Sequence, residues 1–144
     1  GGDGGQEEQI LQLIRKKNLI DKVYLLGYRK DIPDLIKDID VLLFSSKKEG
    51  LGTTILDAFL NKIPVVATRV GGIPELVRHE KTGLLTEVGD YRSLAKESIR
   101  ILQTKSLRNE LTEAAYSYQK SFHCSKMVKD TYLLYRSILT HIIE

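Results

Sequence analysis

The alternation of short apolar runs with segments of helical pattern limits the possible folds of this chain more than any other feature. Apolar runs occur at 40–45 (DVLLFS) and 64–67 (PVVA), and such runs are typical of strands in the interior of a parallel sheet. Segments with helical spacing follow them, from Thr53 and within 71–77 (GGIPELV). Strands that alternate with helices predict an α/β fold, a doubly wound parallel sheet with right-handed crossovers.

The same patterns predict the other elements of the chain. The apolar stripe of the last expected helix, at 125–143, is predicted to pack on a core. The glycines at 1–5 are typical of a turn that follows a strand, so we expect the chain to begin inside a larger fold. Further strands are expected at 22–26 and in 82–88, and further helices at 6–17, 32–38, 91–103 and 105–119.

Composition and charge argue against several classes of protein. With 144 residues, of which 42% are hydrophobic and 28% charged, the chain is large enough for one domain with a core. Its net charge of +3 is spread without basic blocks, so no nucleic-acid partner is expected. No apolar run approaches the roughly 18 to 20 residues of a membrane span. The single cysteine, Cys124, and the three histidines lack the spacing of metal ligands, so no metal is expected.

Ligands of such sheets bind beyond the carboxyl ends of the strands. The candidate segments are therefore 27–30, 45–54, 68–75 and 89–91. We expect these segments to supply the functional residues, and the second contains the most informative ones.

The loop at 45–54 (SSKKEGLGTT) combines glycines with an acidic residue. Gly50 and Gly52 allow a ligand to approach the backbone, and the first amides of the following helix can bind a phosphate. Glu49 would repel a phosphate but can accept hydrogen bonds from sugar hydroxyls. The combination indicates a phosphorylated sugar, while a solvated glutamate beside a capped helix explains the same residues.

Asp57 is an unusual carboxylate within the apolar sequence ILDAFL. Thr53, Asp57 and Asn61 lie at i, i+4 and i+8 and therefore share one helix face. This face either lines the cleft at the end of the sheet or is an ordinary solvent-facing stripe. Glu75, after Gly71 and Gly72, likewise either complements a helix dipole or reaches into the cleft.

Residues 49–85 (EGLGTTILDAFLNKIPVVATRVGGIPELVRHEKTGLL) resemble the signature of family 4 glycosyltransferases of the GT-B fold. The flanking sequences GDG, VYLLGYRKDIPDLIKDIDVLLFSS and GD at 89–90 agree with it, so the resemblance covers essentially the whole chain. It implies that residues 1–144 are a C-terminal, Rossmann-like nucleotide-sugar-binding domain without its first strand-helix unit. The implied reaction is transfer of a sugar from a UDP- or GDP-sugar to an acceptor with retention of configuration, and no metal or cofactor is required.

The resemblance also implies roles for individual residues. Glu49 matches the first acid of the family's E-x7-E element, the catalytic-site acid that binds the donor sugar, and Asp57 matches the second acid, which binds the ribose. Asp57 replaces the usual glutamate, so the ribose contact is expected to be longer, water-mediated or lost. Tyr28 and Arg29 match the positions of the nucleobase contacts. The segment that holds the donor sugar and diphosphate consists of Gly50, Leu51, Gly52, Thr53 and Thr54.

The expected partners are the nucleotide sugar, an N-terminal acceptor-binding domain of the same protein, and an acceptor glycan or lipid-linked sugar. The expected location is the cytoplasm, or the inner face of the membrane through the missing domain. The family's diphosphate-binding Arg and Lys lie upstream of residue 1, so we expect the isolated chain to bind donor weakly or not at all and to be inactive. The alternatives are a catalytically silent binding or scaffolding module, or another GT-B enzyme such as a nucleotide-sugar epimerase.

Overall fold

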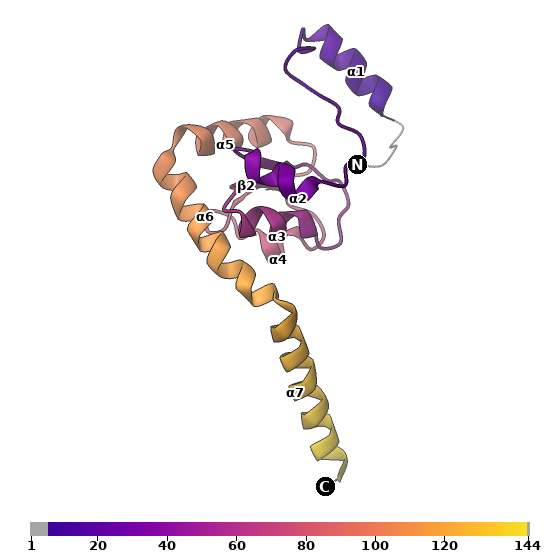
Figure 1. Cartoon of the computed structure of the whole chain (residues 1–144), viewed down its shortest axis with the longest axis vertical. Coiled ribbons are helices and arrows are strands. Elements are labelled where there is room, and N and C mark those ends of the chain that lie inside the picture. Colours follow the sequence, from indigo (N-terminus) through magenta and orange to yellow (C-terminus); the bar gives the residue numbers. More distant parts are fainter. Residues whose placement is uncertain (1–5, 144) are drawn as a thin grey trace. The chain divides into compact units, whose positions relative to one another are not determined.

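The computed structural model describes residues 6–143, and the side chains of residues 6–140 (Figure 1). The chain forms two compact units, which meet in sequence between Ile32 and Pro33. The first unit contains helix α1 (Glu7–Lys16), which confirms the helix predicted at 6–17. Acidic residues occupy its first turn and basic residues its last turn, an arrangement that complements the helix dipole.

The strand predicted at 22–26 is wrong. The described backbone is irregular there, and the amides of Lys22 and Val23 both donate to the carbonyl of Leu19 at 3.0 Å. A strand needs a neighbouring strand for its hydrogen bonds, and in a doubly wound sheet the neighbour of this one is the strand that precedes the helix before it. The described part of the chain holds no strand before α1, so this pairing does not form.

The second unit is built on a parallel sheet, which confirms the predicted α/β fold class. Strands β1 (Leu42–Phe44), β2 (Val65–Thr68) and β3 (Leu84–Thr86) pair in the order β1-β2-β3. All three strands were expected from the sequence; the structure shortens the first and the third, and it shifts the second by one residue. Every residue of β2 and β3 is buried, as expected for a sheet covered on both faces.

The helices that were predicted from the sequence lie within a few residues of their expected positions. The short segments α2 (Ile32–Leu35) and η1 (Ile36–Asp38) together form the helix expected at 32–38. The others in the described part of the chain are α3 (Thr53–Leu60), α4 (Ile73–Leu76), α5 (Tyr91–Gln103), α6 (Lys105–Gln119), η2 (Lys120–Phe122) and α7 (Cys124–Ile143).

The core lies on both faces of the sheet because successive residues of a strand point to opposite sides. Val65 and Ala67 of β2 pack with buried residues of α3 and α4, among them the fully buried Phe59. Val66, between them, belongs to a second cluster that includes Ile101 of α5. The two clusters fix α3 and α5 on opposite faces, so that their N-termini follow the carboxyl ends of β1 and β3.

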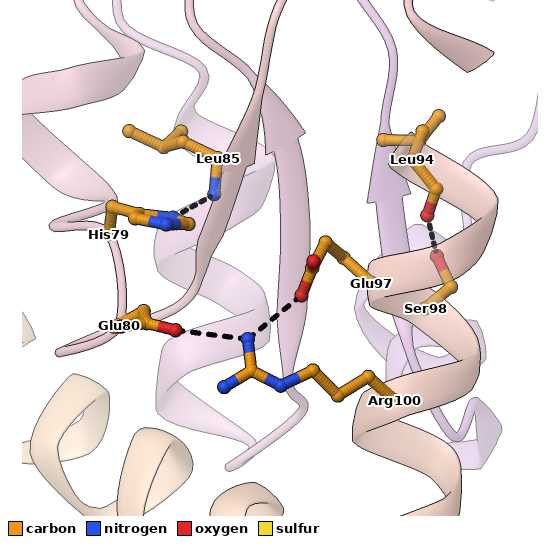
Figure 2. Close-up of polar contacts among 7 residues, drawn as sticks. All are labelled: His79, Glu80, Leu85, Leu94, Glu97, Ser98 and Arg100. Atoms are coloured by element: carbon orange, nitrogen blue, oxygen red, sulfur yellow. Dashed lines mark hydrogen bonds and ion pairs between the residues drawn. The ribbon is translucent and has the colours of Figure 1, made fainter. Parts of the chain in front are cut away.

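Polar contacts hold the turn before β3 against α5 (Figure 2). Arg100 Nη1 donates to Glu80 Oε1 and to Glu97 Oε2, each at 3.0 Å. On the same turn, His79 Nδ1 accepts a hydrogen bond of 3.0 Å from the amide of Leu85 in β3. These contacts fix the start of β3 relative to the helix that follows it.

The prediction that the last helix packs on a core is wrong for its described side chains. Residues 124–140 are exposed, including Val128 at 63% and Tyr135 at 62%. In Figure 1, α7 continues beyond η2 with no other element of the second unit beside it. The apolar stripe of α7 therefore packs against no other element within the described residues. Among the described residues, no helix combines the length and the apolar character that a membrane crossing requires.

Candidate functional site

Three of the four candidate segments come together at the carboxyl edge of the sheet. A pocket of about 100 Å³ lies there, between the ends of β1 and β2 and the start of α5. The strands are parallel, so their carboxyl ends meet at one edge, and this places loops distant in sequence side by side. The pocket is lined by Ser45, Lys47, Thr68, Gly89, Asp90, Tyr91 and Leu94.

Thr68 fixes the loop that follows β1. Its hydroxyl donates to the carbonyl of Ser46 at 2.6 Å, with the carbonyl of Phe44 as a longer acceptor at 3.3 Å. Thr68 is the last residue of β2 and is 4% exposed, so this hydroxyl would be costly to bury without a partner. The contact ties the start of the Glu49 loop to the neighbouring strand.

Asp90 caps α5 at the same edge of the sheet. Its carboxylate accepts hydrogen bonds from the Ser93 hydroxyl at 2.6 Å and from the Ser93 amide at 2.9 Å. These bonds, the one from the hydroxyl foremost, hold the pKa of Asp90 below its ordinary value. The carboxylate therefore stabilises the N-terminus of α5, and the neighbouring Tyr91 remains exposed at the pocket.

The loop that carries Glu49 rests directly on the turn formed by Gly71 and Gly72. The amide of Gly72 donates to the carbonyl of Gly50 at 2.9 Å. A Cβ on Gly71 would lie 1.8 Å from the carbonyl oxygen of Glu49, and one on Gly72 would lie 2.2 Å from that of Gly50. Only glycine allows this contact between the two backbones.

This role of Gly71 and Gly72 was not predicted from the sequence. The available signal was a pair of glycines shortly after the buried strand β2, together with a second glycine-bearing loop after β1. A pair of glycines at this position is typical of a close backbone approach, and here the approaching backbone belongs to the loop at 49–50.

Helix α3 begins without a side-chain cap. Its N-cap is Gly52, in the left-handed region at φ +70°, and a Cβ there would lie 2.6 Å from Ile73 Cδ1. The first amides of α3, from Thr53 and Thr54, therefore have no side-chain acceptor. They form a site to which an anion can bind, and the helix dipole favours negative charge there.

The side chain of Glu49 lies close to this helix start, since its Cγ would be 3.6 Å from a Cβ placed on Gly52. Glu49 is half-buried, and its Oε1 accepts a hydrogen bond of 3.0 Å from the amide of Gly50. The acid therefore uses one bond to its own loop and keeps further acceptor capacity for hydroxyl groups. An acid next to uncapped amides can bind both parts of a phosphorylated sugar.

Asp57 lies on the face of α3 opposite the core. It is half-buried, while Ile55, Ala58 and Phe59 are buried, and its carboxylate has no hydrogen bond or ion pair within the described residues. Asn61, predicted on the same face, is the C-cap of α3, and its side-chain amide donates to the carbonyl of Asp57 at 2.8 Å. Asp57 is thus the acid of this face that is free to accept a ligand.

Tyr28 and Arg29 belong to the other compact unit, so their nucleobase role stays a prediction. Tyr28 is 77% exposed. Arg29 donates from Nε to Asp31 Oδ1 at 2.7 Å and from a terminal nitrogen to Oδ2, and these bonds lower the pKa of Asp31 and raise that of Arg29. In the described part of the chain, no group of three His, Cys, Asp or Glu side chains could hold a metal ion.

Comparison with known proteins gives one family. The family model described as "Glycosyl transferases group 1" matches residues 1–118. The chain is 35% identical over 139 residues to N-acetyl-alpha-D-glucosaminyl L-malate synthase of Bacillus anthracis, which covers 96% of the chain and 36% of that relative. It is 31% identical over 119 residues to UDP-Gal:alpha-D-GlcNAc-diphosphoundecaprenol alpha-1,3-galactosyltransferase of Escherichia coli, covering 81% of the chain and 31% of that relative.

Solved structures agree with this family. The crystal structure of HepE from Anabaena in complex with UDP-glucose matches with a TM-score of 0.78 and 30% identity over 83% of this chain and 33% of that one. Sucrose-phosphate synthase from Thermosynechococcus elongatus matches with a TM-score of 0.81 and 26% identity over 98% of this chain and 36% of that one. The chain therefore spans about a third of the length of the proteins that it matches.

Proposed function

Because the chain belongs to the glycosyl transferases group 1 family, we propose that residues 1–144 are the C-terminal, nucleotide-sugar-binding domain of a family 4 glycosyltransferase. The whole protein would transfer a sugar from a nucleotide donor to an acceptor with retention of configuration. The observation that carries this proposal is Glu49 beside the uncapped N-terminus of α3 at the carboxyl edge of the sheet. A UDP-linked donor is supported by the UDP-glucose in the HepE crystal structure.

Each half of the donor has a chemical counterpart in this site. The diphosphate would bind the open amides of α3, where the helix dipole favours its charge. The sugar hydroxyls would donate to Glu49, whose carboxylate is already held at the loop by the amide of Gly50. Asp57 would accept from the ribose hydroxyls one helical turn further along α3, and Tyr28 and Arg29 would contact the base.

We further propose that the isolated chain binds donor weakly and does not catalyse transfer. Departure of a nucleoside diphosphate requires preorganised positive charge at the diphosphate, and helix amides supply only part of it. The remainder of the charge and the acceptor site would come from other parts of the protein, including an N-terminal acceptor-binding domain.

The acceptor would be a glycan or a lipid-linked sugar, and the reaction would need no metal ion or cofactor. The site would face the cytoplasm, with any association with the inner face of the membrane made through the N-terminal domain. The size of the relatives supports such a second domain, since the chain spans about a third of their length.

Substitution of Glu49 tests the proposed site. Glu49→Ala should remove recognition of the sugar and lower the affinity for UDP-glucose about tenfold or more, while the affinity for UDP stays unchanged. Calorimetric or NMR titration of the chain with each ligand measures both affinities. The matched control is Glu110→Ala, at an exposed position of α6, which should alter neither. Equal losses for UDP and UDP-glucose in Glu49→Ala would contradict the assigned role.

A further inference from the structure

We propose that Tyr118 is a positioning residue of the donor site, which acts on Glu49 through α4. This inference rests on the proposed function and adds a residue of α6 to the site. The Tyr118 hydroxyl donates to the carbonyl of Glu75 at 2.8 Å, across 43 residues of sequence. Glu75 lies in α4, directly after the glycine turn on which the Glu49 loop rests.

The Tyr118 hydroxyl supplies the carbonyl of Glu75 with a hydrogen-bond donor that α4 itself does not provide. Helix α4 is four residues long and ends at Leu76, and the backbone of its C-cap residue, Val77, is extended. The carbonyl of Glu75 therefore lacks the amide that a continuing helix would provide. A helix of this length is not stable alone, so contacts from outside decide its position.

The ring of Tyr118 is fixed on two sides, and this sets the direction of its hydroxyl. The guanidinium carbon of Arg78 lies 4.1 Å from the ring centroid. The ring of Phe122 packs edge-on at a centroid distance of 5.2 Å. Both interactions favour one orientation of the ring and leave the hydroxyl aimed at α4.

A short series of backbone contacts connects Tyr118 to Glu49. The amide of Glu75 donates to the carbonyl of Gly72 at 3.1 Å, and the amide of Gly72 donates to the carbonyl of Gly50 at 2.9 Å. Gly50 in turn donates its amide to the carboxylate of Glu49 at 3.0 Å. A shift of α4 would move Gly72. The loop that packs against Gly72 would then move as well, and with it the carboxylate of Glu49.

Tyr118→Phe tests this connection because it removes the hydroxyl and keeps the ring. Tyr116→Phe is the matched control: Tyr116 is half-buried on the same helix, contacts Lys62 and Lys120 through its ring, and its hydroxyl makes no hydrogen bond within the described residues. In the ligand-free chain, hydrogen exchange at the Gly72 amide should be about two- to tenfold faster in Tyr118→Phe and unchanged in Tyr116→Phe. Unchanged exchange at Gly72 in Tyr118→Phe would overturn the connection.

The second readout is the ratio of the affinities for UDP-glucose and UDP. In Tyr118→Phe this ratio should fall about two- to tenfold while the affinity for UDP is retained, an effect that general loss of stability would not produce. A wild-type ratio in Tyr118→Phe overturns the positioning role and leaves the proposed function intact. Failure of the wild-type chain to bind either ligand overturns the proposed function itself, so the two failures are distinguishable.

Discussion

Gly72 is the residue at which substitution tests the contact between the glycine turn and the Glu49 loop by steric overlap alone. Its φ of −78° suits any residue, so the cost of Gly72→Ala is steric: the added Cβ would lie 2.2 Å from the carbonyl oxygen of Gly50. We expect this variant to lower the free energy of unfolding by about 1–3 kcal/mol, as overpacking does elsewhere. Urea denaturation measures the change.

Gly50→Ala is the control for this experiment. A Cβ on Gly50 would meet no atom within 4 Å, and its φ lies outside the left-handed region. Its free energy of unfolding should therefore stay close to that of the wild type. Equal losses of stability in the two variants would show that the contact between the glycine turn and the loop is not the cause.

Asp57 tests how far a shorter acid can reach. Asp57→Asn removes the charge that would accept from the ribose hydroxyls, so the affinity for UDP should fall about tenfold. Asp57→Glu restores the length usual in the family and should bind UDP at least as tightly as the wild type. Titration calorimetry compares the three proteins, and an unchanged affinity in Asp57→Asn would identify Asp57 as a solvent-facing residue of α3.

The sequence allowed prediction of the acids but not of what holds them. Glu49 and Asp57 stood out because local spacing places one after a strand and the other on the polar face of a helix. The contact between Gly72 and Gly50 was missed because it joins segments that lie in different loops, and no local pattern states which turn a loop will rest on. The role of Asn61 as a C-cap was missed for a different reason. Helical spacing predicts the side of the helix on which a side chain lies, but it does not predict which hydrogen bond that side chain makes.

At the scale of elements, the cap of α5 should depend on pH. The bonds from Ser93 lower the pKa of Asp90 in the folded chain below the ordinary value of 3.8. The stabilisation is therefore fully present above pH 3.8 and is lost as the pH falls through the lowered pKa. An NMR titration of the Asp90 carboxyl carbon should give a midpoint below 3.8, with the Ser93 amide shifting in parallel.

Asp90→Asn provides the comparison, because asparagine also caps helices but does not titrate. In this variant the Ser93 amide signal should lose its acid-dependent shift. A wild-type midpoint for Asp90 at or above 3.8 would contradict the cap as an interaction of the charged carboxylate.

Most helices and the three strands of the sheet could be predicted because their signals are local. A window of a few residues is enough to recognise the apolar runs of β2 and β3. The same holds for the glycine before α3 and the aspartate before α5. Two element-scale predictions failed where the outcome depends on a distant partner. The segment at 22–26 has no neighbouring strand in the described structure, and the stripe of α7 is apolar but has no described element to pack on.

At the scale of the whole molecule, we propose that the chain carries a donor site but lacks some of the groups that complete the transfer. The second unit positions Glu49, the start of α3 and Asp57 along one edge of its sheet. The chain spans about a third of the length of its relatives, which is consistent with an acceptor site and diphosphate-binding cations elsewhere in the protein. Sequence resemblance was needed to reach this conclusion, because the physical patterns alone left each residue with a structural explanation.

Titration of the 144-residue chain with UDP-glucose, followed by the shifts of its backbone amide signals, tests the central claim most directly. This measurement detects millimolar affinity and locates the site at the same time. The account predicts saturable shifts concentrated in residues 49–57 and in the glycine turn at 71–72. Absence of shifts at saturating millimolar ligand, or shifts confined to other parts of the chain, would contradict it.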